Sequence, residues 1–201
     1  MKSRTDKSIL NFEAVVIGTS AGGMNALQVI LKSLPRYFAL PVIIVQHLHP
    51  NSDDYSARIL NDSCKMIVKQ ANEKEKIGPG VVYTAPPNYH LLVEENKTFS
   101  LSIAEREKYA RPSINVLFET AADVYGAKLI GIILTGANND GSEGLKRIKE
   151  KGGLTIVQDP ETAEVDSMPR DAIAATKVDY ILPLEQIGPI LRKMSQKQED
   201  G

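Results

Sequence analysis

The amino-acid sequence predicts an α/β fold: a doubly wound, mostly parallel β-sheet flanked by helices, with an inserted β-hairpin. Short, continuously apolar runs rich in Val and Ile recur along the chain, which is typical of strands covered on both faces. Segments with the helical period separate several of these runs, and alternating β and α units form parallel sheets. With 201 residues, 42% of them hydrophobic, the chain is long enough for a sizeable core, and we expect one domain spanning residues 1–201.

The predicted elements follow one another in a regular order. Apolar runs predict strands at residues 14–17, 42–45, 81–84, 129–134 and 154–157. Helical periodicity is clearest at residues 24–34 and 114–124. One stretch breaks the alternation, because the apolar segments 90–93 and 99–103 flank the polar segment 94–97. This pattern predicts a β-hairpin in or beside the parallel sheet.

Composition excludes several classes of partner. The 24 basic and 25 acidic residues nearly cancel, so we expect neither a nucleic-acid partner nor an anionic membrane surface. The longest apolar stretches are far shorter than the ~20 residues that span a bilayer, so no membrane insertion is expected. The single cysteine, Cys64, has no partner for a disulfide within the chain, and the N-terminus lacks the apolar run of a signal peptide. We therefore predict a cytoplasmic protein.

The first predicted strand leads directly into the turn Gly-Thr-Ser-Ala-Gly-Gly at residues 18–23, after which the helical period begins. A strand, a tight turn and a helix are the setting in which a serine hydroxyl is presented on a sharp bend, here Ser20. Backbone N–H groups at a helix start also favour a phosphate or dinucleotide. Because Ser20 occupies the place of the second glycine of Gly-x-Gly-x-x-Gly, and no Gly-Lys-Ser/Thr is present, the pattern favours a nucleophilic serine.

A serine nucleophile needs a base and a carboxylate, and each has a candidate just beyond a predicted strand. His47 follows the strand at 42–45, and Asp140 follows the strand at 129–134, so both lie at the carboxyl edge where Ser20 emerges. Each has a plainer interpretation: His47 as an ordinary loop residue, and Asp140 as part of a turn and helix cap. His47 and His49 also resemble a pair of metal ligands, but no second cluster accompanies them, so no metal or other cofactor is expected.

Ser20, His47 and Asp140 together predict a catalytic triad. Three residue types of the right chemistry each lie one loop beyond a buried strand, on one edge of the sheet. Their order along the chain differs from that of α/β-hydrolases and of the two familiar serine-protease folds, so the usual hydrolase fold is disfavoured. The rival hypothesis is a non-catalytic α/β module that binds phosphate or nucleotide through the turn at 18–23.

Six motifs resemble the catalytic domain of the chemotaxis-receptor methylesterases, the protein-glutamate methylesterase (CheB) family. They are IGTSAGG at 17–23, QHLHP at 46–50, APPNYH at 85–90, RPSINVLF at 111–118, LTGANNDG at 134–141 and MPRDAI at 168–173. The resemblance covers residues 12–192, in family order. It implies a hydrolase of glutamate γ-methyl esters in the methylated cytoplasmic helices of chemotaxis receptors, which also deamidates particular receptor glutamines. Ser20 would be the nucleophile, His47 the base and Asp140 the orienting carboxylate.

The chain departs from the family pattern in two places. The loop before the aspartate commonly reads Thr-Gly-Met-Gly-x-Asp-Gly, and here Ala137 and Asn138 replace the Met and the second Gly. Family members commonly carry an N-terminal receiver domain, whereas the first predicted strand here begins at residue 14, so no receiver domain is expected in this chain. The remaining candidates for oxyanion binding or for lining the substrate site are Ala21, Ala137, Arg111 and Met168. For Arg111 the alternative is a solvated residue at a helix start, and for Met168 a core filler.

Overall fold

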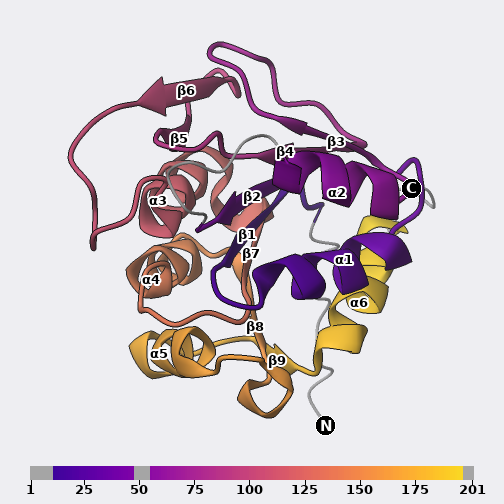
Figure 1. Cartoon of the computed structure of the whole chain (residues 1–201), viewed down its shortest axis with the longest axis vertical. Helices are drawn as coiled ribbons and strands as arrows, with labels where there is room; N and C mark the ends of the chain where they lie inside the picture. The colour runs from indigo at the N-terminus through magenta and orange to yellow at the C-terminus, as the bar shows by residue number, and fades with distance from the viewer. Residues whose placement is uncertain (1–10, 48–54, 197–201) are drawn as a thin grey trace, which may run out of the picture.

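The computed structural model describes residues 11–47 and 55–196. Its main sheet comprises β1 (Ala14–Thr19), β2 (Val42–Gln46), β3 (Ile67–Gln70), β4 (Val81–Thr84), β7 (Leu129–Ile133), β8 (Leu154–Gln158) and β9 (Tyr180–Leu182). These seven strands lie in the order β3-β4-β2-β1-β7-β8-β9, and every neighbouring pair is parallel (Figure 1). The predicted α/β fold with a parallel sheet is confirmed.

Helices cover both faces of the sheet (Figure 1). One layer contains α1 (Gly23–Ser33), α2 (Tyr55–Ser63) and α6 (Leu184–Gln196), and the other contains α3 (Ile114–Tyr125), α4 (Ser142–Glu150) and α5 (Ser167–Ala175). Two short 3₁₀ turns, η1 (Gly126–Lys128) and η2 (Pro160–Thr162), join elements of the second half of the chain.

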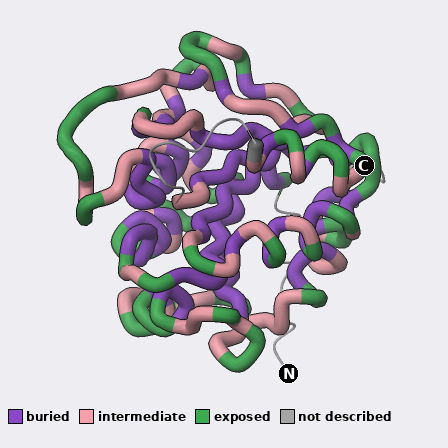
Figure 2. Tube along the Cα trace, viewed as in Figure 1, coloured by how far each residue is buried: buried purple, intermediate pink, exposed green. Residues whose placement is uncertain are grey.

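The central strands are buried (Figure 2) and lie between two apolar clusters, one under each helix layer. Successive side chains of a strand point to opposite faces, so β1 contributes Val16 to the cluster beneath α3 and α4, and Val15 and Ile17 to the cluster beneath α1. All six residues of β1 are buried. This double burial is why the central strands are continuously apolar in sequence.

The predicted hairpin forms beside the sheet. β5 (His90–Val93) and β6 (Phe99–Ser102) pair antiparallel in a separate two-stranded sheet that packs on α3 (Figure 1). Phe99 is fully buried and meets the ring of Tyr83 edge to face, with 4.9 Å between the ring centroids. The hairpin therefore extends the core on the α3 side of the molecule.

The order of the strands reverses at β1. Its neighbour on one side is β2, and its neighbour on the other is β7, which comes much later in the chain. The register pairs Thr19 with Gln46 and Gly18 with Ile133, so the three strands end at nearly the same level. In open parallel sheets, ligands bind outside the carboxyl ends of strands at such a switch point.

Two edge strands, β3 and β9, were not predicted from the sequence. Both are short, and Ile67 of β3 and Ile181 of β9 are exposed, so neither strand has the continuously apolar pattern of the centre. Within the described residues, no helix combines the length and apolar character needed to cross a membrane.

Candidate active site

Ser20 lies at the end of β1, where the backbone turns into α1. Its N–H donates to the carbonyl of Thr135 (3.0 Å), and its own carbonyl accepts from Gly23 N–H (2.9 Å). The Thr135 carbonyl also accepts from Thr19 Oγ1 (2.8 Å), which joins the loop after β7 to the end of β1. A side chain on Gly136 would not fit, because its Cβ would lie 2.7 Å from Met168 Cε and 3.0 Å from Ser20 Cβ. The nucleophile candidate is thus held between two strand ends.

His47 lies just past the end of β2, the strand next to β1. Its backbone N–H donates to Thr19 O (3.0 Å), which continues the β1–β2 ladder by one residue. The imidazole Nε2 lies 2.8 Å from Asp140 Oδ2, and the His47 side chain is 13% exposed. The structure therefore brings the predicted base and carboxylate into direct contact.

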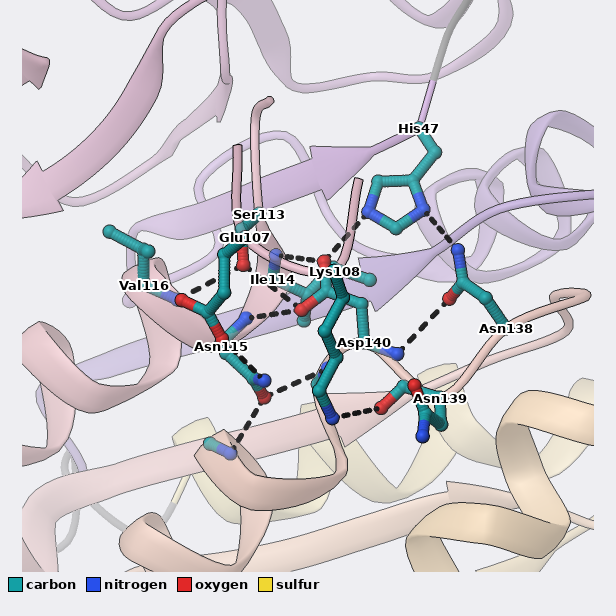
Figure 3. Close-up of polar contacts among 12 residues, drawn as sticks. His47, Glu107, Lys108, Ser113, Ile114, Asn115, Val116, Asn138, Asn139 and Asp140 are labelled. Atoms are coloured by element: carbon teal, nitrogen blue, oxygen red, sulfur yellow. Dashed lines mark hydrogen bonds and ion pairs between the residues drawn. The ribbon is translucent and has the colours of Figure 1, made fainter. Parts of the chain in front are cut away.

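Asp140 is completely buried and accepts four hydrogen bonds (Figure 3). Its Oδ1 accepts from Ser113 Oγ (3.0 Å) and Asn115 N–H (3.0 Å), and its Oδ2 accepts from Ile114 N–H (2.7 Å) and His47 Nε2 (2.8 Å). The two backbone donors belong to the first turn of α3, whose positive dipole end favours a carboxylate. A buried carboxylate with this many donors is well satisfied.

The hydrogen bonds decide the charge of Asp140. Burial raises the pKa of its carboxyl, but the bonds from His47 and from the Asn115 and Ile114 N–H groups outweigh this effect, and the pKa lies below its ordinary value of 3.8. Asp140 is therefore ionised at neutral pH. As an anion it can only accept, so His47 Nε2 carries a proton and the other ring nitrogen, Nδ1, faces away from the carboxylate.

The start of α4, directly after Asp140, is also hydrogen-bonded to a side chain of α3. Asn115 Oδ1 accepts from Gly141 N–H and Gly144 N–H, both at 2.9 Å, at the start of α4. Gly141 has a φ of 100°, and a Cβ there would lie 2.6 Å from Ile133 Cδ1, so a side chain would be both strained and crowded. Glycine after the aspartate is what lets the loop place the carboxylate under His47.

Ser20 and His47 line the same pocket, which has a volume of about 260 Å³. The other described lining residues are Arg106, Lys108, Tyr109, Ala110, Arg111, Pro112 and Asn138. Three of them are cationic and none is acidic, so the described wall of the pocket favours negative charge.

A tight turn forms part of the pocket rim. Glu107 and Ala110 exchange two backbone hydrogen bonds (3.1 and 2.8 Å) around Lys108 and Tyr109, whose φ values are 46° and 67°. Two-residue turns of this kind favour Asn or Gly, so Lys and Tyr are strained there. Tyr109 is 94% exposed, and Lys108 Nζ reaches back to Asn139 O (3.4 Å; Figure 3). The turn presents a cation and an aromatic ring beside the pocket.

The four further candidates are placed differently. Ala21 and Ala137 are exposed, and no hydrogen bond among the described residues uses the backbone N–H of either. Arg111 lines the pocket, with Nη1 donating to two carbonyls of the preceding loop (2.8 and 3.0 Å). Met168 is fully buried behind Gly136 and is not among the residues that line the pocket. Its surroundings are those of a core filler.

Sequence reasoning missed the side chains that hold the site together. Ser113 and Asn115 contact Asp140, and His90 supports Ser113, because Ser113 N–H donates to His90 Nδ1 (3.2 Å). The helical period predicted over residues 114–124 was the available signal, since the N-terminal N–H groups of a helix favour a carboxylate. Asn138 contacts His47 through its side chain, which no sequence pattern indicated. His49 lies outside the described residues, and the described ones contain no group of three possible metal ligands.

Comparison with known proteins places this geometry in a family. The model of the CheB methylesterase family matches residues 15–191. The chain belongs to the CheB methylesterase family. The crystal structure of the Thermotoga maritima CheB methylesterase catalytic domain superposes with a TM-score of 0.87 at 35% identity, covering 91% of this chain and 98% of that one.

Members of the family differ in length. A protein of Leptospira interrogans is 58% identical over 187 residues, covering 93% of this chain and 97% of its own length. The protein-glutamate methylesterase/protein-glutamine glutaminase of Thermotoga maritima is 36% identical over 184 residues, and the match covers 54% of that protein. The chain thus spans about half the length of this second CheB relative.

Proposed function

We propose that this CheB family member is a cytoplasmic serine hydrolase that removes methyl groups from glutamate γ-methyl esters of chemotaxis receptors. The observation that carries the proposal is the contact between His47 and the buried, ionised Asp140, next to Ser20 in one pocket. The names of the relatives support the choice of ester, and the family supports chemotaxis receptors as partners.

In the acylation step, Ser20 Oγ attacks the ester carbonyl carbon and its proton passes to His47 Nδ1. Asp140 stabilises the imidazolium through Nε2–H. The tetrahedral intermediate collapses as the bond to the methoxy oxygen breaks, and that oxygen takes the proton from Nδ1 and leaves as methanol. Ser20 then carries a glutamyl acyl group.

The negative oxygen of the tetrahedral intermediate needs hydrogen-bond donors. Ala21 N–H is the donor that follows the nucleophile, and Ala137 N–H lies in the loop held against Ser20. Both are free of partners among the described residues. One such donor contributes about 10²–10³ in rate in a comparable hydrolase, so two suffice for a large part of the catalysis.

Hydrolysis of the acyl-enzyme returns the site to its starting state. His47 takes a proton from a water molecule as the water oxygen attacks the acyl carbon. When the bond between the acyl carbon and Ser20 Oγ breaks, Ser20 Oγ takes this proton from His47. The product is a glutamate side chain. Glutamine deamidation, the second activity in the names of the relatives, follows the same steps with ammonia as the leaving group.

The pocket rim suits an acidic protein segment. Arg106, Lys108 and Arg111 line the pocket, and the strained turn exposes Tyr109 beside them. A receptor helix whose unmethylated glutamates surround the ester would place carboxylates against these cations. This complementarity supports a methylated, glutamate-rich receptor helix as the partner.

A phosphate-binding module remains the rival function, and the turn at 18–23 argues against it. Two of its backbone N–H groups, those of Ser20 and Gly23, already donate within the protein.

Treatment with a serine-directed fluorophosphonate, followed by peptide mapping, separates the hydrolase hypothesis from the phosphate-binding hypothesis. The hydrolase is labelled at Ser20, and His47→Ala abolishes the labelling. A binding module offers no activated hydroxyl and stays unlabelled, which would refute the proposal.

A further inference from the structure

The side-chain amide of Asn138 bridges the backbone of Asp140, in its own loop, and the imidazole of His47, which follows β2 (Figure 3). Its Oδ1 accepts from Asp140 N–H (3.1 Å), and its Nδ2 lies 3.1 Å from His47 Nδ1. A backbone N–H only donates, so the amide oxygen must face Asp140 and the NH₂ group must face His47. Turning the amide over would place NH₂ against that N–H and break the bond.

The amide fixes what His47 Nδ1 does. An NH₂ group has only protons to offer, so Nδ1 must be the acceptor in this contact. Asp140 requires the proton on Nε2, and Asn138 requires the lone pair on Nδ1, so both neighbours select the same neutral tautomer. This is the tautomer that a base for Ser20 needs.

The same contact also occupies the base. An imidazole nitrogen has one lone pair in the plane of the ring, and the Asn138 amide uses it. Within the described part of the chain, no hydrogen bond joins Ser20 Oγ to His47, although both side chains line one pocket. Ser20 and Asn138 therefore need the same lone pair, and in this structure Asn138 has it.

We propose that Asn138 is a positioning residue that competes with Ser20 for His47 Nδ1 and keeps the free enzyme in a resting state. Asn138 lines the pocket, so a bound substrate can reach it. A carbonyl oxygen of the substrate offers the NH₂ group another acceptor, and the lone pair of Nδ1 then becomes available to the Ser20 proton. Activation of the nucleophile is thereby coupled to occupation of the pocket. The inference rests on the proposed hydrolase function.

Two substitutions of Asn138 separate competition from a structural role. Asn138 is not among the residues with positive φ, so Asn138→Ala does not strain the backbone. It removes the competitor, and the second-order rate of Ser20 labelling by a small fluorophosphonate should rise about two- to tenfold, the factor that one net hydrogen bond is worth. Asn138→Asp keeps an oxygen for Asp140 N–H but places a carboxylate against Nδ1, which favours the imidazolium, so labelling at pH 7 should fall at least about tenfold.

The opposite signs are the decisive result. A side chain that merely supports the loop would slow labelling in both variants, together with a lower thermal midpoint. Labelling of Asn138→Ala that is equal to or slower than that of the parent overturns the inference while leaving the hydrolase intact. Absence of labelling at Ser20 in the parent and both variants overturns the proposed function, and the inference with it. Asn138→Gly, which also lacks the amide, replaces Asn138→Ala if that variant does not fold.

Discussion

Replacing Asp140 by Asn separates catalysis from capping at the residue that serves both. The carboxylate accepts one pair of hydrogen bonds on each oxygen, and an amide retains only one of these oxygens. If the NH₂ group replaces Oδ2, it faces both Ile114 N–H and His47. The imidazole then turns to the tautomer with its proton on Nδ1, which cannot accept a proton from Ser20.

The size of each effect follows from these contacts. The equivalent substitution in the serine-protease case costs about 10⁴-fold in rate, and we expect a loss of at least roughly 10² in kcat for an ester, whose leaving group is easier to expel. Ile114 N–H is left buried without an acceptor, which costs about 1–3 kcal/mol of stability. For a chain of this length, that lowers the thermal midpoint by roughly 2–12 °C.

Ser113→Ala is the matched control. It removes one donor to Asp140 Oδ1 but leaves the contact between His47 and Asp140 Oδ2 in place. Its midpoint should fall by a similar amount, while kcat stays within about tenfold of the parent. Steady-state kcat at 25 °C and the thermal midpoint are measured for both variants. If Asp140→Asn retains kcat within a few-fold of the parent, Asp140 only caps α3, and the triad is refuted.

Acid titration provides an independent check on Asp140. Because its folded pKa lies below the ordinary value of 3.8, its ionised form stabilises the fold fully above about that pH. The contribution is lost as the pH falls through the folded pKa. The difference in unfolding free energy between the parent and Asp140→Asn should therefore shrink between pH 5 and pH 2. A constant difference over this range would contradict the lowered pKa.

Two further predictions concern the base and the rim. The rate of ester hydrolysis should fall as the pH is lowered through the range of about 5–8 in which histidines protonate, since an imidazolium cannot accept the Ser20 proton. A rate that stays constant across that range would contradict a histidine base. Lys108→Glu should raise KM for methylated receptor about two- to tenfold, and the increase should be larger at low salt. The control is Lys146→Glu, at an exposed position on α4, which should leave KM unchanged. Equal effects of the two substitutions on KM would refute rim recognition.

The fold was predictable where burial on both faces requires a continuously apolar run in the sequence. Central strands such as β1 and β7 are buried on both faces and are continuously apolar, so both were found. β3 and β9 lie at the edges and expose apolar and polar side chains alike, so neither has a continuously apolar sequence. The hairpin was found from its polar turn, but whether it joined the sheet depended on packing against α3.

The site was predictable as far as strand ends determine it. Ser20, His47 and Asp140 each follow a strand, and parallel strands end at one edge, so their proximity follows from topology. The donors to Asp140 come from α3, whose docking is a tertiary event without a local pattern. The direction of the Asn138 side chain depends on the path of one loop. Met168 could not be assigned to pocket or core until that loop was seen to pack over it.

Methanol release from methylated chemotaxis receptor tests the central claim most directly. The full chain is incubated with receptor carrying radiolabelled methyl groups, and volatile label is counted for the parent and for Ser20→Ala, with folding of the variant checked by its thermal midpoint. The parent should release methanol, and the folded variant should release none above the uncatalysed rate. Release by Ser20→Ala at the rate of the parent would contradict Ser20 as the nucleophile and, with it, the account of the site.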